Sequence, residues 1–236
     1  MSSPQEPHSR QFSHVNGTVQ DIIDRVAMAE LCKGWPVYRD ASEWMNFRSL
    51  FTDDAQVWTT WSGVQTIDGF IEVSKAGKAT GAFIQHRECG TLVELNSDAG
   101  RAVGKMKATI TQRFVEPGTG IEYDVDCDCR FLFFCERQGV ASVPGDDGTL
   151  SWKARYVKLV YEKDKVVPAD GLRAPTFSPE DLSKFPEGYR YLGAAQQLLG
   201  YQIDLKLATA KDETTWKQMY VSMEKWLSGK DADLFW

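Results

Sequence analysis

Three histidines occur in the 236-residue chain, and histidine is the side chain whose ordinary pKa lies closest to neutrality. His8 and His14 fall in a polar opening segment, whereas His86 lies in GAFIQHRECG, a stretch predicted to be extended. Removal of a proton next to a carbonyl group needs such a base, so His86 is the first candidate for acid–base catalysis. A lone histidine in an apolar strand can equally be a core residue with satisfied polar atoms, and both interpretations stay open.

The cysteines offer a second possible chemistry. They number five, an odd count in a chain of intracellular composition, so free thiols are expected in place of a disulfide framework. Cys127 and Cys129 in DCDC have C-x-C spacing, but no second Cys/His pair stands at ligand spacing and only His86 could add an imidazole. We therefore predict no metal site and interpret both thiols as packing residues, since a nucleophilic thiol would need an adjacent base.

The composition excludes several classes of partner. The formal net charge is −6 and the sequence pI is about 5.2, with no run of Lys or Arg, which argues against nucleic acid and anionic membranes. No stretch reaches about 18 consecutive apolar residues, and the opening segment lacks the pattern of a signal peptide. We therefore expect a cytoplasmic protein.

The elements that must position these side chains begin with a helix. Residues 1–17 have the composition of a disordered leader, and the fold should start near Val19. From there an apolar stripe recurs at helical spacing, at Ile22, Val26, Ala29 and Cys32 or Lys33. Pro36 should kink or end this helix.

Further elements follow along the chain. DASEWMNFRSLF predicts a second short helix with Asp40 or Ser42 as its N-cap. Later segments are a strand near 57–61, a helix over 67–78, strands over 82–95, 102–115, 121–138 and 150–162 with a loop over 139–148, and helices over 189–202 and 212–229. This order predicts an α+β fold in which one curved, mainly antiparallel sheet wraps around the N-terminal helices and a C-terminal helical extension follows.

The predicted domain covers residues 18–165, and residues 166–236 form a linker and a helical extension too small for a core of its own. In that extension Trp216, Tyr220 and Met223 lie on one helical stripe. We expect the stripe to pack on the barrel or on a neighbouring subunit.

Alternation along two strands assigns their faces. In EYDVDCDCRFLFF the odd-numbered residues are apolar or soft and most of the others are charged, while the preceding strand has its apolar set at even positions from Met106 to Phe114. The lysines Lys105 and Lys107 are expected to face the aspartates across the ladder, so the acidic run is interpreted as structural and not as a cation site.

The segments YRDASEWMNFRSLFTDDAQV and GAFIQHRECGTLVEL, followed in order by ATITQRF, CRFLFFCER and SWKARYVKLVYEKD, carry a resemblance to a known family. Over about residues 20 to 165 the chain resembles the SnoaL-like branch of the nuclear-transport-factor-2-like superfamily, which includes scytalone dehydratase and bile-acid dehydratase. The resemblance implies a cone-shaped α+β barrel that performs dehydration, cyclisation, isomerisation or ligand binding, usually with no cofactor.

Within this resemblance, His86 matches the first catalytic histidine of the dehydratase. The second falls at Thr111 or Gln112, and strand parity favours Gln112. The helix-borne aspartate of the family aligns with Val37, with Tyr38 and Asp40 nearby, so the carboxylate that would orient the histidine is missing from its expected place. If His86 is catalytic, help is expected from tyrosine, glutamine or water.

A cone of this kind binds its ligand among aromatic side chains with a few polar groups. For the reaction, His86 would act as the base, Tyr38 or Gln112 would polarise a carbonyl group, and Tyr123 or a water molecule would supply a proton. The predicted substrate-binding residues are Trp58, Trp61, Tyr123, Cys127, Cys129, Phe131, Tyr156 and Met106.

The first functional hypothesis is a cofactor-free lyase or isomerase, dehydratase-like, that acts on a small hydrophobic oxygenated aromatic, polyketide or terpenoid-type metabolite. Two alternatives are a shape-driven cyclase of secondary metabolism and a non-catalytic small-molecule-binding domain. A homo-oligomer, dimer or trimer, is expected from the resemblance.

Overall fold

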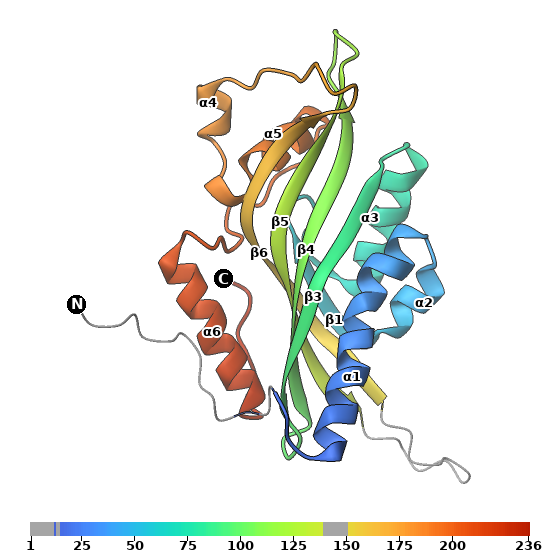
Figure 1. Cartoon of the computed structure of the whole chain (residues 1–236), viewed down its shortest axis with the longest axis vertical. Helices are drawn as coiled ribbons and strands as arrows, with labels where there is room; N and C mark the ends of the chain where they lie inside the picture. Colours follow the sequence, from blue (N-terminus) through green and yellow to red (C-terminus); the bar gives the residue numbers. More distant parts are fainter. Residues whose placement is uncertain (1–11, 13–14, 139–150) are drawn as a thin grey trace, which may run out of the picture.

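In the computed structural model, residue 12 and residues 15–138 and 151–236 are described. Most of the predicted leader at 1–17 and the whole loop predicted at 139–148 lie outside these residues. The described residues form one six-stranded sheet in the order β2-β1-β6-β5-β4-β3. Figure 1 shows this sheet as a long curved layer between α1, α2 and α3 on one side and α6 on the other.

All neighbouring strands pair antiparallel except β1 and β6, which are parallel. The bounds are β1 (Phe51–Thr59), β2 (Gly63–Thr66), β3 (Ile84–Asn96), β4 (Arg101–Val115), β5 (Glu122–Gln138) and β6 (Ser151–Pro168). The predicted α+β fold with a curved, mainly antiparallel sheet is confirmed, although the sheet stays unclosed, with β2 and β3 at its edges. The last strand continues past the predicted start of the linker at residue 166.

Alternation determines the faces of the two central strands, as predicted. In β5 the odd-numbered residues from 123 to 133 are buried, while the even-numbered residues from 122 to 130 are exposed or half-buried. In β4 the even-numbered residues from Met106 to Phe114 are buried, and the same burial extends back to Ala102. These buried sides form the wall on which the helices pack.

The acidic run of β5 has structural partners, but they are not the two lysines of β4. Lys105 and Lys107 lie opposite Leu132 and Arg130. The aspartates instead bind an arginine and two threonines of β4 and two lysines of β6, in the pairs Arg113–Asp124, Thr111–Asp126, Thr109–Asp128, Lys163–Asp128 and Lys165–Asp126. The expected lysine–aspartate ladder within this strand pair was wrong because the register offsets the two charged runs.

The helix α1 (Val19–Gly34) begins at the predicted residue. Thr18 caps it, because its hydroxyl accepts the Asp21 N–H and the Asp21 carboxylate accepts the Thr18 N–H. The predicted apolar stripe was wrong at Ile22 and Val26, which are 46% and 56% exposed, and right at Cys32, which is fully buried. Besides Cys32, the helix turns Asp24, Met28 and Leu31 to the protein interior.

The kink expected at Pro36 takes a specific form. The α-helix ends at Gly34 and passes into a π-helical turn, Trp35–Arg39, in which Pro36 lacks the N–H that an α-helix would use. The wider turn places Trp35 and Arg39 in the interior. The next helix, α2 (Trp44–Ser49), begins after Glu43, so Asp40 and Ser42 do not cap it as predicted.

The third helix, α3 (Ile67–Ala79), begins at the predicted residue and lies on the same side of the sheet as α1 and α2 (Figure 1). On that face Trp35 packs against Phe131 and Phe133 of β5, with ring centroids 5.3 and 6.1 Å apart. At one point the backbones approach closely, since a side chain at Gly104 would meet the Cys32 sulfur at 2.4 Å. The core of the protein therefore lies between α1, the π turn and the middle of β4 and β5.

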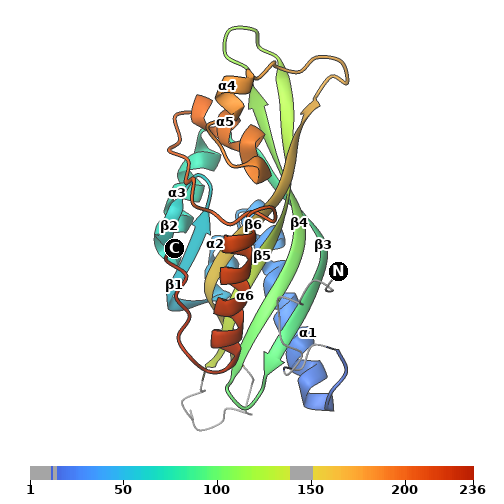
Figure 2. The same cartoon turned by 90° about the vertical axis from the view of Figure 1, so that its left-hand side faces the viewer.

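The C-terminal extension contributes α4 (Pro179–Leu182), a 3₁₀ turn (Glu187–Tyr189), α5 (Arg190–Leu198) and α6 (Glu213–Leu227). Figure 2 shows α4 and α5 above α6 along the sheet. The Trp226 ring of α6 packs on Phe134 and its Nε1 donates to two strand carbonyls. The helix that carries the predicted stripe thus packs on the sheet of its own chain, with Met223 fully buried. In contrast, α5 packs on the opposite face, the one that α1 covers, where its Gln196 donates to Gln112 of β4.

Candidate active site

His86 is hydrogen-bonded to a carboxylate. Its Nδ1 lies 2.7 Å from Asp40 Oδ1, and its backbone N–H donates to Asp40 Oδ2 at 2.6 Å. Because an ionised carboxylate only accepts, Nδ1 carries the hydrogen toward Asp40 and Nε2 is the unprotonated nitrogen of the neutral imidazole. No other described residue forms a hydrogen bond to Nε2, and the imidazole lines an internal cavity.

The π turn explains why this aspartate reaches the histidine. Asp40 follows the turn directly, and β3 presents His86 to it opposite Ile110 of β4. The expectation of no carboxylate beside His86 was wrong: the aligned position, Val37, is 57% exposed, and the carboxylate comes from three residues later.

Burial dominates the electrostatics of the histidine. The imidazole is 4% exposed, and burial lowers the pKa of His86 below its ordinary value, more than the hydrogen bond to Asp40 raises it. The nearby charges of Arg39 and Lys78 lower this pKa further. His86 is therefore neutral at pH 7, which is the form a general base needs.

The cavity around His86 is narrow and walled by aromatic rings. Its volume is about 20 Å³, enough for a water molecule or two. An adjoining hollow of about 10 Å³ shares five lining residues with it. The first cavity is lined by Trp35, Arg39, Thr59, Thr60, Trp61, Phe70, Ile84, His86, Ile110, Gln112, Phe131, Leu159, Tyr161, Leu192 and Gln196.

The C-terminal extension closes this cavity. Gln196 of α5 donates to the Gln112 amide oxygen at 3.0 Å and accepts the Thr60 hydroxyl at 2.9 Å. At the start of α5, the Leu192 N–H donates to Asp164 of β6 at 2.8 Å. The desolvation of Asp164 raises the pKa of its carboxyl group to about 6. Residues far from the predicted domain therefore form one wall of the candidate site.

Buried polar groups without hydrogen bonds gather at the same place. Arg39 is 3% exposed, and neither its Nε nor its Nη1 has a hydrogen-bond partner within the described residues. The same holds for Ser74 Oγ, which lines the adjoining hollow, and for Trp35 Nε1, which lines the cavity. Most buried polar atoms in proteins are paired, so these groups mark a site that can receive a ligand.

Four predicted site residues meet in this cavity: His86, Gln112, Trp61 and Phe131. Strand parity placed Gln112 correctly. The other choice, Thr111, binds Asp126 instead of facing the cavity. Their chemical roles stay predictions.

The other predicted site residues lie outside the cavity lining. Trp58 packs against Tyr156 and Phe235, with ring centroids 6.0 and 5.3 Å away. Tyr156 also contacts Trp226 of α6, so these two aromatics belong to the packing on α6 and the last residues of the chain. Tyr38 lies on the π turn and is half-buried, but it is not among the lining residues.

The remaining candidates lie elsewhere in the buried face of the sheet. Tyr123 stacks on Phe114 at 5.6 Å, and Met106 is fully buried. The Cys127 thiol donates to the Gly188 carbonyl and the Cys129 thiol to the Ala108 carbonyl. Burial raises the pKa of Cys127 and of Cys129 well above the ordinary value, so neither is an activated nucleophile.

Sequence reasoning missed Asp40, Arg39, Ser74 and Gln196. The kink predicted at Pro36 was a usable signal, because π-helical turns inside helices frequently occur at functional sites and Arg39 and Asp40 follow that kink. Nothing local identified Gln196, whose partners are 84 and 136 residues away along the chain.

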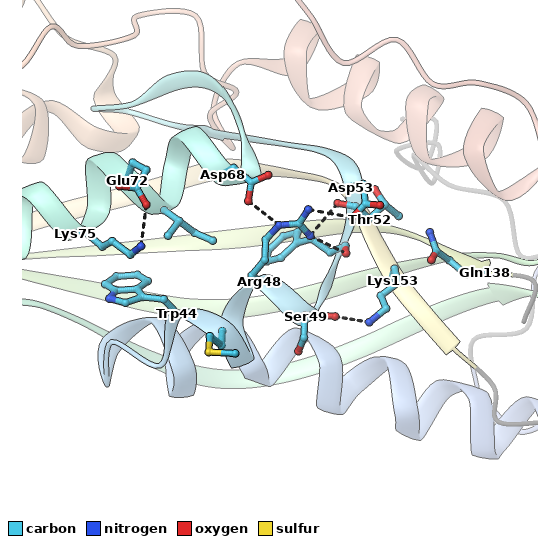
Figure 3. A pocket seen from close by; sticks show the side chains of 13 residues that line it. Trp44, Arg48, Ser49, Thr52, Asp53, Asp68, Glu72, Lys75, Gln138 and Lys153 are labelled. Carbon is cyan, nitrogen blue, oxygen red and sulfur yellow. Dashed lines mark hydrogen bonds and ion pairs between the residues drawn. The ribbon is translucent and has the colours of Figure 1, made fainter. Parts of the chain in front are cut away.

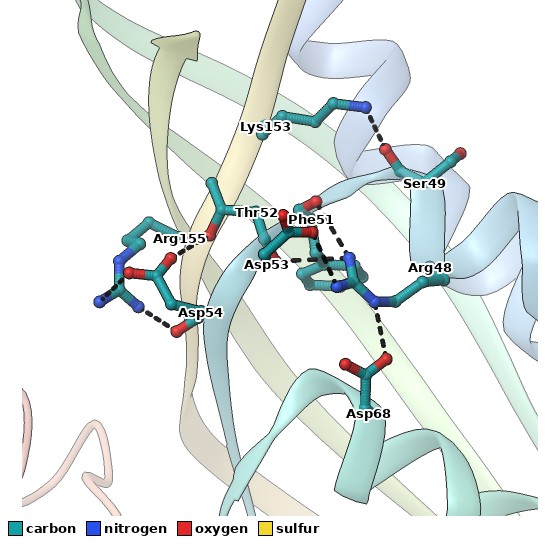
Figure 4. Close-up of polar contacts among 9 residues, drawn as sticks. All are labelled: Arg48, Ser49, Phe51, Thr52, Asp53, Asp54, Asp68, Lys153 and Arg155. Carbon is teal, nitrogen blue, oxygen red and sulfur yellow. Dashed lines mark hydrogen bonds and ion pairs between the residues drawn. The ribbon is translucent and has the colours of Figure 1, made fainter.

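Away from the His86 cavity, a surface groove of about 700 Å³ lies between α2, α3, β1 and β6 (Figure 3). Its charged groups are already paired: Arg48 binds Asp68 at 2.7 Å and Asp53 at 3.1 Å, and Lys153 donates to the Ser49 carbonyl. Figure 4 shows the same network continuing to the Arg155–Asp54 pair. The groove lacks the buried, unpartnered groups of the inner cavity, so we place the candidate site at His86.

Among the described residues, no group of three or more His, Cys, Asp and Glu side chains is arranged to hold a metal ion. No helix in the described segments is long and apolar enough to cross a membrane.

Comparison with known proteins gives the family. The SnoaL-like domain family matches residues 20–158. An uncharacterized protein of Emericella nidulans is 42% identical over 93% of this chain and 92% of its own length, and pea pathogenicity protein 2 of Fusarium vanettenii is 39% identical over 99% and 98%. Among solved structures, a hexachlorocyclohexane dehydrochlorinase from Novosphingobium barchaimii has a TM-score of 0.50 at 15% identity, over 67% of this chain and 99% of that one. The chain therefore belongs to the SnoaL-like domain family.

Proposed function

We propose that the cavity around His86 is the active site of a cofactor-independent lyase or isomerase that acts on a small hydrophobic oxygenated metabolite of aromatic, polyketide or terpenoid type. The observation that supports this proposal is the His86–Asp40 pair, which faces an internal cavity walled by aromatic rings. A neutral imidazole oriented by a carboxylate is suited to proton transfer at a carbon atom.

In the proposed reaction, His86 Nε2 removes the proton from the carbon next to a carbonyl group, and the resulting charge spreads onto the carbonyl oxygen. Asp40 stabilises the imidazolium through Nδ1 and acts as a positioning residue. The imidazolium then returns the proton, either to the leaving hydroxyl group, which departs as water, or to a different carbon atom. The first outcome is a dehydration and the second an isomerisation.

Gln112 is the candidate that we favour for polarising the carbonyl oxygen of the substrate. Its amide oxygen already accepts the Gln196 N–H, so the Gln112 amide N–H₂ group remains as a donor toward the cavity. A donor held in place before the reaction stabilises the developing oxyanion without reorganisation.

The substrate can enter only if the wall moves, because about 20 Å³ cannot hold a metabolite. The movable part is α5, since Gln196 and Leu192 line the cavity from a segment that follows the whole sheet in sequence. We propose that α5 moves outward to admit substrate and then closes over it, which would exclude water from the reaction.

The test is to screen β-hydroxy ketones, phenols and polyketide-type alcohols for loss of water or isomerisation by mass spectrometry and NMR. The variant His86→Gln should lower turnover by about 10² to 10⁴. The exposed neighbour Gln85, changed to Ala, is the matched control and should leave turnover unchanged. Turnover by His86→Gln within a few fold of the wild type rules out base catalysis and favours a shape-driven cyclase.

A thermal-shift experiment with the same compounds separates catalysis from simple binding. Compounds that stabilise the protein and are recovered unchanged would support a non-catalytic binding domain. The predicted dimer or trimer needs a surface other than the buried side of α6, and light scattering measures the subunit number directly. A cytoplasmic location and a part in secondary metabolism remain predictions.

A further inference from the structure

Arg39 is a buried cation whose hydrogen-bonding capacity is largely unused. Its guanidinium lies 5.5 Å from the centre of the Phe70 ring, and its Nη1 lies 3.7 Å from Asp40 Oδ1, within ion-pair distance but too far for a hydrogen bond. Both Asp40 oxygens already accept hydrogen bonds from His86. Nε and Nη1 of Arg39 therefore have no hydrogen-bond partner among the described residues, although a guanidinium in the protein interior normally binds an anion through hydrogen bonds in good geometry.

Ser74 supplies a second, independent donor at the same place. The residue is 4% exposed, its hydroxyl is buried without a partner among the described residues, and it comes from α3 instead of the π turn. Arg39 and Ser74 both line the hollow that adjoins the His86 cavity.

The charge around these two donors is positive. Lys78 also lines the hollow, and its ammonium group donates to the Asp40 backbone carbonyl. None of the described residues that line the cavity or the hollow is an aspartate or a glutamate. A site with two cations, a free hydroxyl and no lining carboxylate is complementary to an anionic oxygen group.

From this arrangement we infer that the hollow beside His86 is a carboxylate-binding subsite, in which Arg39 and Ser74, supported by the charge of Lys78, bind a carboxylate group of the substrate. The substrate would then be an oxygenated carboxylic acid, held so that its acidic C–H group points to His86. The assignment of this carboxylate to a substrate rests on the proposed function. The binding of a carboxylate at the subsite does not depend on that function.

The experiment uses three carboxylates of increasing size, formate, acetate and benzoate, each paired with its neutral amide. Titration calorimetry and thermal shift at constant ionic strength should show binding of carboxylates and at least tenfold weaker binding of the amides. Sodium chloride and inorganic phosphate are the further arms, and equal responses to them would show a general anion site and overturn the inference.

Three variants locate the binding. Arg39→Met should weaken carboxylate binding at least tenfold, Ser74→Ala a few fold, and Arg48→Met, in the surface groove, should leave it unchanged as the charge-matched control. If Arg39→Met does not fold, Arg39→Lys, which keeps the charge but changes the donor geometry, and Ser74→Ala carry the test. Wild-type affinity in the Arg39 and Ser74 variants, or no carboxylate binding by the wild type, would overturn the inference.

Failure of this inference can be told from failure of the proposed function. Carboxylate binding that depends on Arg39, together with full turnover in His86→Gln, would leave a binding site without base catalysis. Turnover that depends on His86, with carboxylate affinity independent of Arg39, would support base catalysis by His86 and overturn the carboxylate-binding subsite.

Discussion

Replacing Asp40 by asparagine should reverse the tautomer of His86 without unfolding the protein. Asp40 accepts two hydrogen bonds from His86, one from the backbone N–H at 2.6 Å and one from Nδ1 at 2.7 Å. Asparagine offers one acceptor and one donor group in the same shape. The backbone N–H cannot stop donating, so the asparagine oxygen must stay with it and the NH₂ group must face Nδ1. The imidazole can accept there only by moving its hydrogen to Nε2.

The expected loss of activity follows from that shift. With a hydrogen on Nε2, the atom that faces the cavity is no longer a base, and turnover should fall by about 10² to 10⁴, equivalent to about 3 to 5 kcal/mol of activation free energy. Stability should fall less, by about 1 to 3 kcal/mol, because both hydrogen bonds persist and only their charge assistance is lost. The carboxylate also raises the pKa of His86, so the variant should have an even lower pKa at this imidazole.

Nitrogen NMR of the imidazole tests the reasoning without a substrate, since it distinguishes the two neutral tautomers and follows their protonation. His86→Gln assigns the signal, and Asp68→Asn, which removes an exposed carboxylate, is the matched control. A wild-type imidazole that carries its hydrogen on Nε2, or an Asp40→Asn imidazole that keeps it on Nδ1, would refute the proposed dyad.

Three further predictions concern pH, thiols and packing. Folding lowers the pKa of His86, so on acidification the unfolded chain binds a proton at this imidazole at a higher pH than the folded protein does. The free energy of unfolding is therefore unaffected by this group above about pH 6.5 and decreases as the pH falls from there toward the folded-state pKa. Urea unfolding should show this decrease in the wild type and not in His86→Gln. Native alkylation followed by mass spectrometry should label only Cys89, the one exposed thiol, and Cys89→Ser should abolish labelling. Gly104→Ala, which would crowd the Cys32 sulfur, should destabilise the protein by about 1 to 3 kcal/mol in the same unfolding assay. Gly77→Ala is the control, because its added methyl group would make an ordinary contact with the Tyr201 hydroxyl at 3.6 Å, and it should cause no such loss.

The strand faces were predictable because a period of two depends only on the sequence of one strand. The alternation from Tyr123 to Phe133 fixed the buried side of β5, and the same argument chose Gln112 over Thr111. Trp58 shows where it fails: the end of β1, residues 57–59, is buried on both sides, so parity could not tell the cavity from the packing on Tyr156 and Phe235.

The dyad could not be predicted because it depends on a change of helical period. The resemblance aligned the family's aspartate with Val37, but the π turn inserts extra backbone and carries Asp40 to the histidine, 46 residues away in sequence. The charges that a helical pattern assigns to the surface are thus turned inward at the turn, which buries Arg39 as well.

Closure and affinity are linked in this site. Gln196 holds α5 over the cavity with two neutral hydrogen bonds, each of which contributes about 0.5 to 1.5 kcal/mol. These bonds alone cost about 1 to 3 kcal/mol to break, and the burial of Leu192 and Ala195 adds to the cost of opening, so the open form is populated at less than about 15%. The measured dissociation constant of any ligand is then larger than the intrinsic one by the inverse of that fraction. A ligand that satisfies Arg39 and Ser74 gains hydrogen bonds that no described residue supplies, and these bonds offset part of the opening cost and favour closure around the anion.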